Sequence, residues 1–142
     1  MCAEFNALHY PSLYEKTAAG TPFPAAVFVL YVFYSCDSLE RIDADPNNPF
    51  FSSDEYGFLF DKEKTTLLGC PGGYRGIYTI PTNVQSFDNN VFSGNKNLSG
   101  LIIPGTVSNI IYRSFENCTG LKTVTIMNGV DNIGKYAFMG CN

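Results

Sequence analysis

The apolar residues in the C-terminal half of the chain recur at one constant spacing, that from Phe92 to Phe115 and from Phe115 to Phe138. Two further columns keep the same spacing: Ile80, Ile103 and Ile126; and Val84, Val107 and Val130. A period held by several columns means that each unit presents the same positions to one continuous core between stacked units. The pattern therefore predicts a repeat solenoid with coils of about 23 residues.

Each unit contains one short segment in which apolar and polar residues alternate. In Leu121–Ile126 the alternation centres on Val124 and Ile126, which is the period of a half-buried β-strand. Asn128-Gly129 after this segment is a turn signal, and Pro104 ends the equivalent segment one unit earlier. The following stretch, from position 107 to 115, fits a second short strand, a bend or a single helical turn.

The repeat pattern resembles the BspA-type (treponemal-type) leucine-rich repeat. The residues that carry the resemblance run from Leu98 through Leu101, Ile103-Pro104, Val107 and Ile110 to Phe115-Glu-Asn-Cys118. The match covers residues 78–142 without a gap and resumes upstream at Phe33–Cys36, Leu39 and Ile42. The resemblance implies a mainly β, leucine-rich-repeat solenoid with short helical or irregular segments on its convex side.

An insertion interrupts the register between the upstream and downstream repeats. Phe33 and Phe92 belong to the same column, but they are separated by one repeat plus an additional segment that is longer than a repeat. Within the insertion, Gly57–Phe60 and Thr65–Leu68 are two β-prone runs joined by the charged Asp61–Lys64, which predicts a hairpin with a four-residue loop.

Domain bounds follow from the register. We expect an N-terminal arm of uncertain structure at 1–20 and a solenoid at 21–142. The solenoid divides into a degenerate first coil at 21–45, the hairpin insertion at about 46–77 and regular repeats at 78–142. The apolar run from Ala25 to Tyr34 is too short to cross a bilayer, and no clear signal peptide precedes it.

Composition argues against several function classes. The formal net charge is −4 with no cluster of Lys or Arg, so we expect no nucleic-acid partner. The single histidine, His9, has no Ser or Cys placed near it by the pattern, and Gly72-Gly73 follows a hairpin rather than a parallel strand. We therefore predict that the protein is not an enzyme and holds no cofactor.

Cysteines and acidic residues are interpreted as structural. Cys36, Cys118 and Cys141 share one repeat column, where a buried thiol packs well; a disulfide between the last two, in adjacent coils, is geometrically conceivable. The spacing of acidic residues from Asp43 to Asp54 imitates a calcium loop, but Pro46 and the missing glycine at the sixth position favour a plain turn. No metal site is predicted.

Side chains that face away from the core on successive strands form the candidate protein-binding face. They are Glu40, Arg41, Asp43, Thr79, Ser99, Ile102, Lys122, Thr123 and Thr125. An ordinary solvated face is the alternative interpretation. The family resemblance implies a module of a cell-surface or secreted protein that adheres to host matrix proteins or cells. The alternative is an intracellular or structural scaffold, or a repeat fragment that self-associates through uncapped ends, since no polar cap follows the last repeat.

Overall fold

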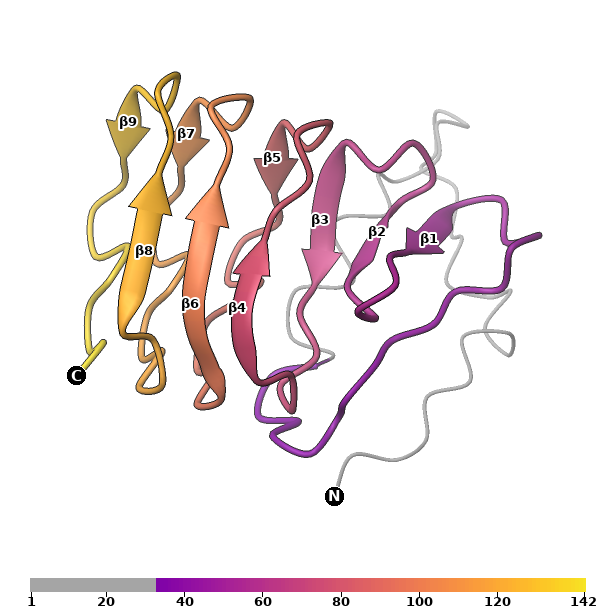
Figure 1. Cartoon of the computed structure of the whole chain (residues 1–142), viewed down its shortest axis with the longest axis horizontal. Helices are drawn as coiled ribbons and strands as arrows, with labels where there is room; N and C mark the ends of the chain where they lie inside the picture. The colour runs from indigo at the N-terminus through magenta and orange to yellow at the C-terminus, as the bar shows by residue number, and fades with distance from the viewer. Residues whose placement is uncertain (1–32) are drawn as a thin grey trace, which may run out of the picture.

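Residues 33–142 are described by the computed structural model, and they form nine short strands with no helix among them. The expected N-terminal arm, the first half of the degenerate coil and His9 lie outside the described residues. Figure 1 shows the strands arranged as successive coils that stack side by side along the long axis. In this part of the chain, no helix is long and apolar enough to span a membrane.

Three parallel strands line one side of the stack: β4 (Gly76–Thr79), β6 (Leu98–Ile103) and β8 (Thr123–Ile126). Tyr78 pairs with Leu101, and Leu101 pairs with Val124, so neighbours in the sheet are one repeat apart in the sequence. This register confirms the predicted strand in each unit. The buried residues of these strands alternate with residues that face outward, as a half-buried sheet requires.

A second short strand follows in each coil as the chain returns: β5 (Ser86–Phe87), β7 (Asn109–Ile110) and β9 (Asn132–Ile133), here called the return strands. Of the alternatives left open for this stretch, the second short strand is the one that forms, and the described residues contain no helix here. Each of these coils has two residues with positive φ, four apart, just after its return strand. They are Asn90 and Gly94, Arg113 and Asn117, and Tyr136 and Gly140. The residues between each pair form tight turns, such as the one in which the Ser93 N–H donates to Asn90 O at 2.9 Å.

The insertion folds as a three-stranded antiparallel unit made of β1 (Phe51–Ser53), β2 (Leu59–Asp61) and β3 (Thr66–Gly69). The predicted hairpin corresponds to β2 and β3, and its loop is closed by the Asp61 carboxylate, which accepts hydrogen bonds from the backbone N–H groups of Thr65 (2.7 Å) and Thr66 (2.9 Å). Strand β1 was not predicted. Because β3 pairs in parallel with β5, the hairpin supplies the return strand of the preceding coil.

A ladder of phenylalanine rings runs through the core. The rings of Phe92 and Phe115 stack with centroids 5.0 Å apart, and those of Phe115 and Phe138 with centroids 4.9 Å apart. Beside the ladder, the Sγ of Cys118 donates to the carbonyl oxygen of Phe92 (2.9 Å), and the Sγ of Cys141 donates to that of Phe115 (3.1 Å). Repeated ring and thiol contacts therefore join each coil to the next.

The last coil leaves part of its apolar surface exposed. Ile126 and Ile133 are 39% and 52% exposed, whereas the equivalent Ile103 and Ile110 one coil earlier are at most 1% exposed. The difference arises because each coil buries its core positions against the next one.

Candidate functional site

Two rows of outward-facing residues cross the β4–β6–β8 sheet. Thr79, Ile102 and Thr125 pair directly across the three strands and form the first row. Together with the second row described below, they form what we call the strand face. Figure 1 shows that the three strands run side by side, so the rows lie on one continuous surface.

Four of the nine predicted site residues lie on the strand face: Thr79, Ile102, Thr123 and Thr125. Ser99 sits at a bulge where β6 carries one more residue than β4, and the backbone N–H of Lys122 donates to its carbonyl oxygen at 2.9 Å. Ser99 and Lys122, two further predicted residues, lie beside the rows, because Ser99 is the bulge residue and Lys122 directly precedes β8. Whether they bind a partner stays a prediction.

The other three predicted residues, Glu40, Arg41 and Asp43, are not on a strand, contrary to expectation. The backbone around them bonds to the insertion and to the turn that follows it: the Ile42 N–H donates to Gly57 O (2.9 Å), and Leu39 O accepts from Gly73 N–H (2.8 Å). The expectation failed because the insertion begins at once after this segment and provides its hydrogen-bond partners.

Arg41 and Asp43 also neutralise each other. The guanidinium donates to both carboxylate oxygens of Asp43, at 3.1 Å and 2.7 Å, and to the carbonyl oxygen of Glu55 at 2.6 Å. The hydrogen bond from Arg41 lowers the pKa of Asp43, and the same bond raises the pKa of Arg41. Both side chains are exposed, so solvent screens the pair and its contribution to stability is small.

Two members of the second row of the strand face, Ile77 and Gly100, were not predicted from the sequence. Ile77, Gly100 and Thr123 pair across the sheet, and Ile77 is 61% exposed. A Cβ on Gly100 would lie 2.9 Å from Cγ1 of Ile77 and 2.7 Å from Oγ1 of Thr123, so the glycine leaves room for both side chains. The spacing of one repeat between Ile77 and Gly100 was the signal that could have located this row.

An aromatic cluster supports the edge of the strand face. Phe58 stacks on Tyr78 with centroids 3.5 Å apart, and Tyr74 packs edge-on against both rings. The Tyr78 hydroxyl donates to the Asp54 carboxylate at 2.5 Å; burial and this hydrogen bond raise the pKa of Tyr78. Tyr56, which is 48% exposed, lies 6.1 Å from Tyr74 and Tyr78 between ring centroids. The insertion thus places the exposed Tyr56 against packed aromatic rings next to β4.

The described residues contain no group of three or more His, Cys, Asp or Glu side chains placed to hold a metal ion. The acidic residues that imitate a calcium loop have other partners: Asp43 binds Arg41, and Asp45 accepts from the backbone N–H of Asn47 at 2.7 Å. Asp54 binds the Tyr78 hydroxyl and the N–H groups of its own turn.

The described cysteines differ in their oxidation state. Cys70, Cys118 and Cys141 are free thiols, so the disulfide considered between the last two is not formed. Burial raises the pKa of Cys118 to about 12, which removes it as a nucleophile at neutral pH. Cys36 is disulfide-bonded, which corrects its interpretation as a buried thiol.

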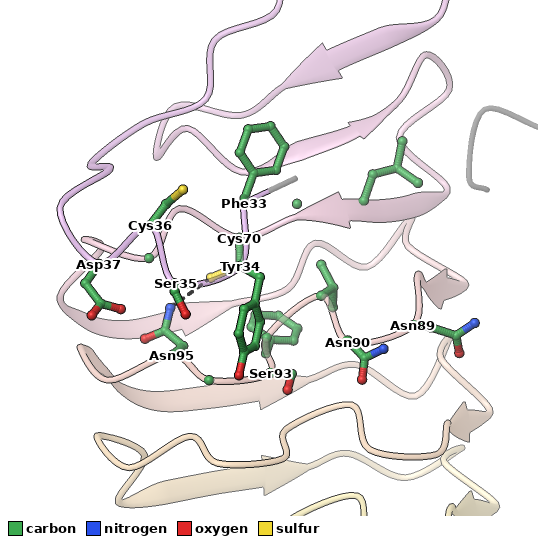
Figure 2. A pocket seen from close by; sticks show the side chains of 16 residues that line it. Phe33, Tyr34, Ser35, Cys36, Asp37, Cys70, Asn89, Asn90, Ser93 and Asn95 are labelled. Atoms are coloured by element: carbon green, nitrogen blue, oxygen red, sulfur yellow. Dashed lines mark hydrogen bonds between the residues drawn. The ribbon is translucent and has the colours of Figure 1, made fainter. Parts of the chain in front are cut away.

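A small pocket lies between the first and second coils (Figure 2), where Asn95 Nδ2 donates to the Sγ of Cys70 at 3.3 Å. Its volume is about 40 Å³, well below the roughly 300–1,000 Å³ typical of small-molecule sites, so it is too small for such a ligand.

Comparison with known proteins agrees with the repeat. The family described as "BspA type Leucine rich repeat region (6 copies)" matches residues 76–142. A leucine-rich repeat protein from Eubacterium ventriosum is similar in structure, with a TM-score of 0.67 and 28% identity over 77% of this chain and 29% of that one. The pneumococcal vaccine antigen PcpA shares the fold, with a TM-score of 0.52 and 21% identity over 68% of this chain and 29% of that one. The chain therefore spans less than a third of either solved chain, and no curated protein matches it.

Proposed function

We propose, from the premise that residues 76–142 are BspA-type leucine-rich repeats, that the protein binds another protein through the strand face. Repeats of this kind use extended surfaces built from successive units for protein binding. The observation that carries the proposal is the apolar content of this face: Ile77 is 61% exposed and Ile102 is half-buried among threonines. Exposed apolar side chains on a fixed sheet can be buried by a partner with little loss of conformational entropy.

The finer proposal is that the protein belongs to a cell surface or is secreted, and adheres to host matrix proteins or cells. Support comes from the matched repeat family and from PcpA, a pneumococcal vaccine antigen with the same fold. The exposed tyrosine Tyr56 beside the strand face adds the kind of side chain that is enriched at the centre of protein interfaces.

Self-association through the end of the stack is the second candidate. Ile126 and Ile133 in the last described coil are exposed, whereas their equivalents one coil earlier are buried by a neighbouring coil. Either a second copy or a further coil of the same chain would cover them in the same way.

A matched pair of double variants tests the proposal. Ile102→Glu with Thr125→Glu places two carboxylates directly opposite each other on the strand face. Asn109→Glu with Asn132→Glu does the same on β7 and β9, where both residues are exposed. Like charges in direct cross-strand pairs weaken a sheet in both variants, so the folded-state cost is comparable.

The readout is saturable binding of the full chain to immobilised host matrix proteins and to host cells. We expect the wild type and the β7–β9 variant to bind, and the strand-face variant to lose binding. Equal binding by the two variants would reject the strand face. An absence of binding by the folded wild type would reject adhesion, and light scattering that then shows a dimer would favour self-association.

A further inference from the structure

A second, larger hollow opens where the chain leaves the return strands β5 and β7. Its volume is about 420 Å³, within the range of roughly 300–1,000 Å³ typical of small-molecule sites. Its walls come from three successive coils: Tyr34 from the first, residues 89–93 from the second and residues 112–117 from the third. The hollow is separate from the strand face, so the proposed protein binding makes no use of it.

Two exposed tyrosines line this hollow. Tyr34 and Tyr112 are 50% and 51% exposed. The ring of Tyr34 rests on Gly94, where a Cβ would lie 3.0 Å from the ring carbon Cε2. Figure 2 shows Tyr34 beside Ser93, with its hydroxyl at the outer end of the ring. The absence of a side chain at Gly94 therefore lets the ring lie close to the backbone of the second coil.

Two neighbouring side chains, Arg113 and Tyr136, contact the ring of Tyr112. The guanidinium of Arg113 lies 5.0 Å from the centroid of that ring, and the ring of Tyr136 packs against it edge-on at 5.9 Å. Such contacts fix the orientation of an otherwise exposed ring. The hollow is thus bounded by two aromatic rings whose positions are set before any ligand arrives.

The remaining lining is polar and carries no net charge. Its two charged side chains, Arg113 and Glu116, form an ion pair with 3.5 Å between Nη1 and Oε2. The other polar side chains are amides and hydroxyls, which both donate and accept hydrogen bonds: Asn89, Asn90, Ser93 and Asn117. The buried Nε of Arg113 has no acceptor among residues 33–142, so a hydrogen-bond donor remains unsatisfied beside the hollow.

From this arrangement we propose that the hollow binds a neutral hexose unit, packed against Tyr34 and Tyr112 and hydrogen-bonded by the amides that line the hollow with them. A hexopyranose ring has an apolar C–H face that packs on aromatic rings, and a rim of hydroxyls that pair with amide groups. The mutual neutralisation of Arg113 and Glu116 disfavours a ligand with net charge. The hexose is either a free sugar or one unit of a longer glycan, since both present the same ring.

The test uses the full chain and four probes: galactose, glucose, N-acetylglucosamine and the anionic N-acetylneuraminic acid, each titrated by saturation-transfer NMR. Tyr112→Ala should weaken binding of the neutral probes by about tenfold, the effect expected for removing one aromatic contact. Tyr56→Ala is the matched control, because Tyr56 is equally exposed (48%) but lies beside the strand face. It should leave the titration unchanged.

A second variant guards against a folding defect. Asn90 has a φ of 60°, a conformation that glycine adopts freely, so Asn90→Gly removes the amide without straining the backbone. It should also weaken binding while leaving the melting temperature within a few degrees of the wild type. Immobilised neutral polysaccharides, tested beside the free sugars, distinguish the two sources of the hexose.

Three outcomes would overturn the inference: no saturable binding of any neutral probe, unchanged affinity in both variants, or a preference for N-acetylneuraminic acid. The strand-face variant Ile102→Glu with Thr125→Glu should bind the sugars normally. The two proposals can therefore fail independently.

Discussion

Replacement of Phe115 by alanine should destabilise the protein more than any other single truncation in the phenylalanine ladder. Phe115 is fully buried, and its ring contacts the ladder rings on both sides as well as Phe87, edge-on at 6.1 Å. Truncation of a buried phenylalanine to alanine costs about 3–5 kcal/mol, because both the buried area and the packing around the cavity are lost. Whole domains are stable by only about 5–15 kcal/mol.

The matched variant is Phe138→Ala in the last coil. Phe138 is only partly buried and stacks on Phe115 alone within the described ladder. We expect it to lose about half as much free energy of unfolding, roughly 1.5–2.5 kcal/mol. Thermal unfolding followed by circular dichroism measures both, and the Phe115 variant should melt about 10–20 °C below the wild type.

Equal destabilisation by the two variants would refute the reasoning. It would mean that each ring is stabilised by contacts within its own coil, and that the stacking between coils contributes little. A larger loss for Phe138→Ala would refute it more strongly, since the more exposed ring would then matter more.

Three further predictions concern polar side chains. Tyr78→Phe removes a hydrogen bond to the Asp54 carboxylate and should lower the free energy of unfolding by about 1.5–3 kcal/mol. Tyr74→Phe removes a hydrogen bond to a neutral carbonyl oxygen and should lower it by only about 0.5–1.5 kcal/mol; equal losses in urea unfolding would contradict this. Burial raises the pKa of Asp88, and its buried Oδ2 has no partner among the described residues, so the folded state favours the protonated form. Asp88→Asn should therefore have a higher free energy of unfolding than the wild type at pH 7. The difference should shrink as the pH falls through the raised pKa towards about pH 4, because the wild-type carboxyl becomes protonated. A difference that is constant with pH would exclude this cause. Iodoacetamide at pH 8 should label Cys118 only after denaturation, because burial raises its pKa to about 12, and rapid labelling of the folded protein would show that the thiol is accessible.

The repeat register could be predicted from the sequence because it depends on a property that each coil repeats. Leu101 and Val124 occupy equivalent positions in successive repeats, and the structure pairs them. The prediction from the repeat register failed at the segment before the insertion, where the chain does not repeat the structure of the later coils. Arg41 was assigned to a strand by extending the columns across the insertion, but the insertion takes over the hydrogen bonds of that segment.

Two other features carried too little signal in the sequence. Positive φ at Arg113 and Tyr136 is set by the shape of the turn that each coil repeats, and neither residue type indicates it. The aromatic cluster joins Phe58 from the insertion to Tyr78 at the start of the regular repeats, so no period relates its members. The hollow between Tyr34 and Tyr112 depends on stacking of three coils and is likewise invisible in any single repeat.

The parallel pairing of β3 with β5 connects the hairpin to the stack through β3. The second strand of the hairpin, β3, occupies the position of an ordinary return strand. The spacing of the coils therefore does not depend on the length of the hairpin loop. Its loop, between Asp61 and Thr66, is therefore a point at which a foreign peptide could be displayed at a defined place beside the turn that leads into β5. Variation in the length of this loop would change what the protein presents to a partner while the stack itself stayed the same.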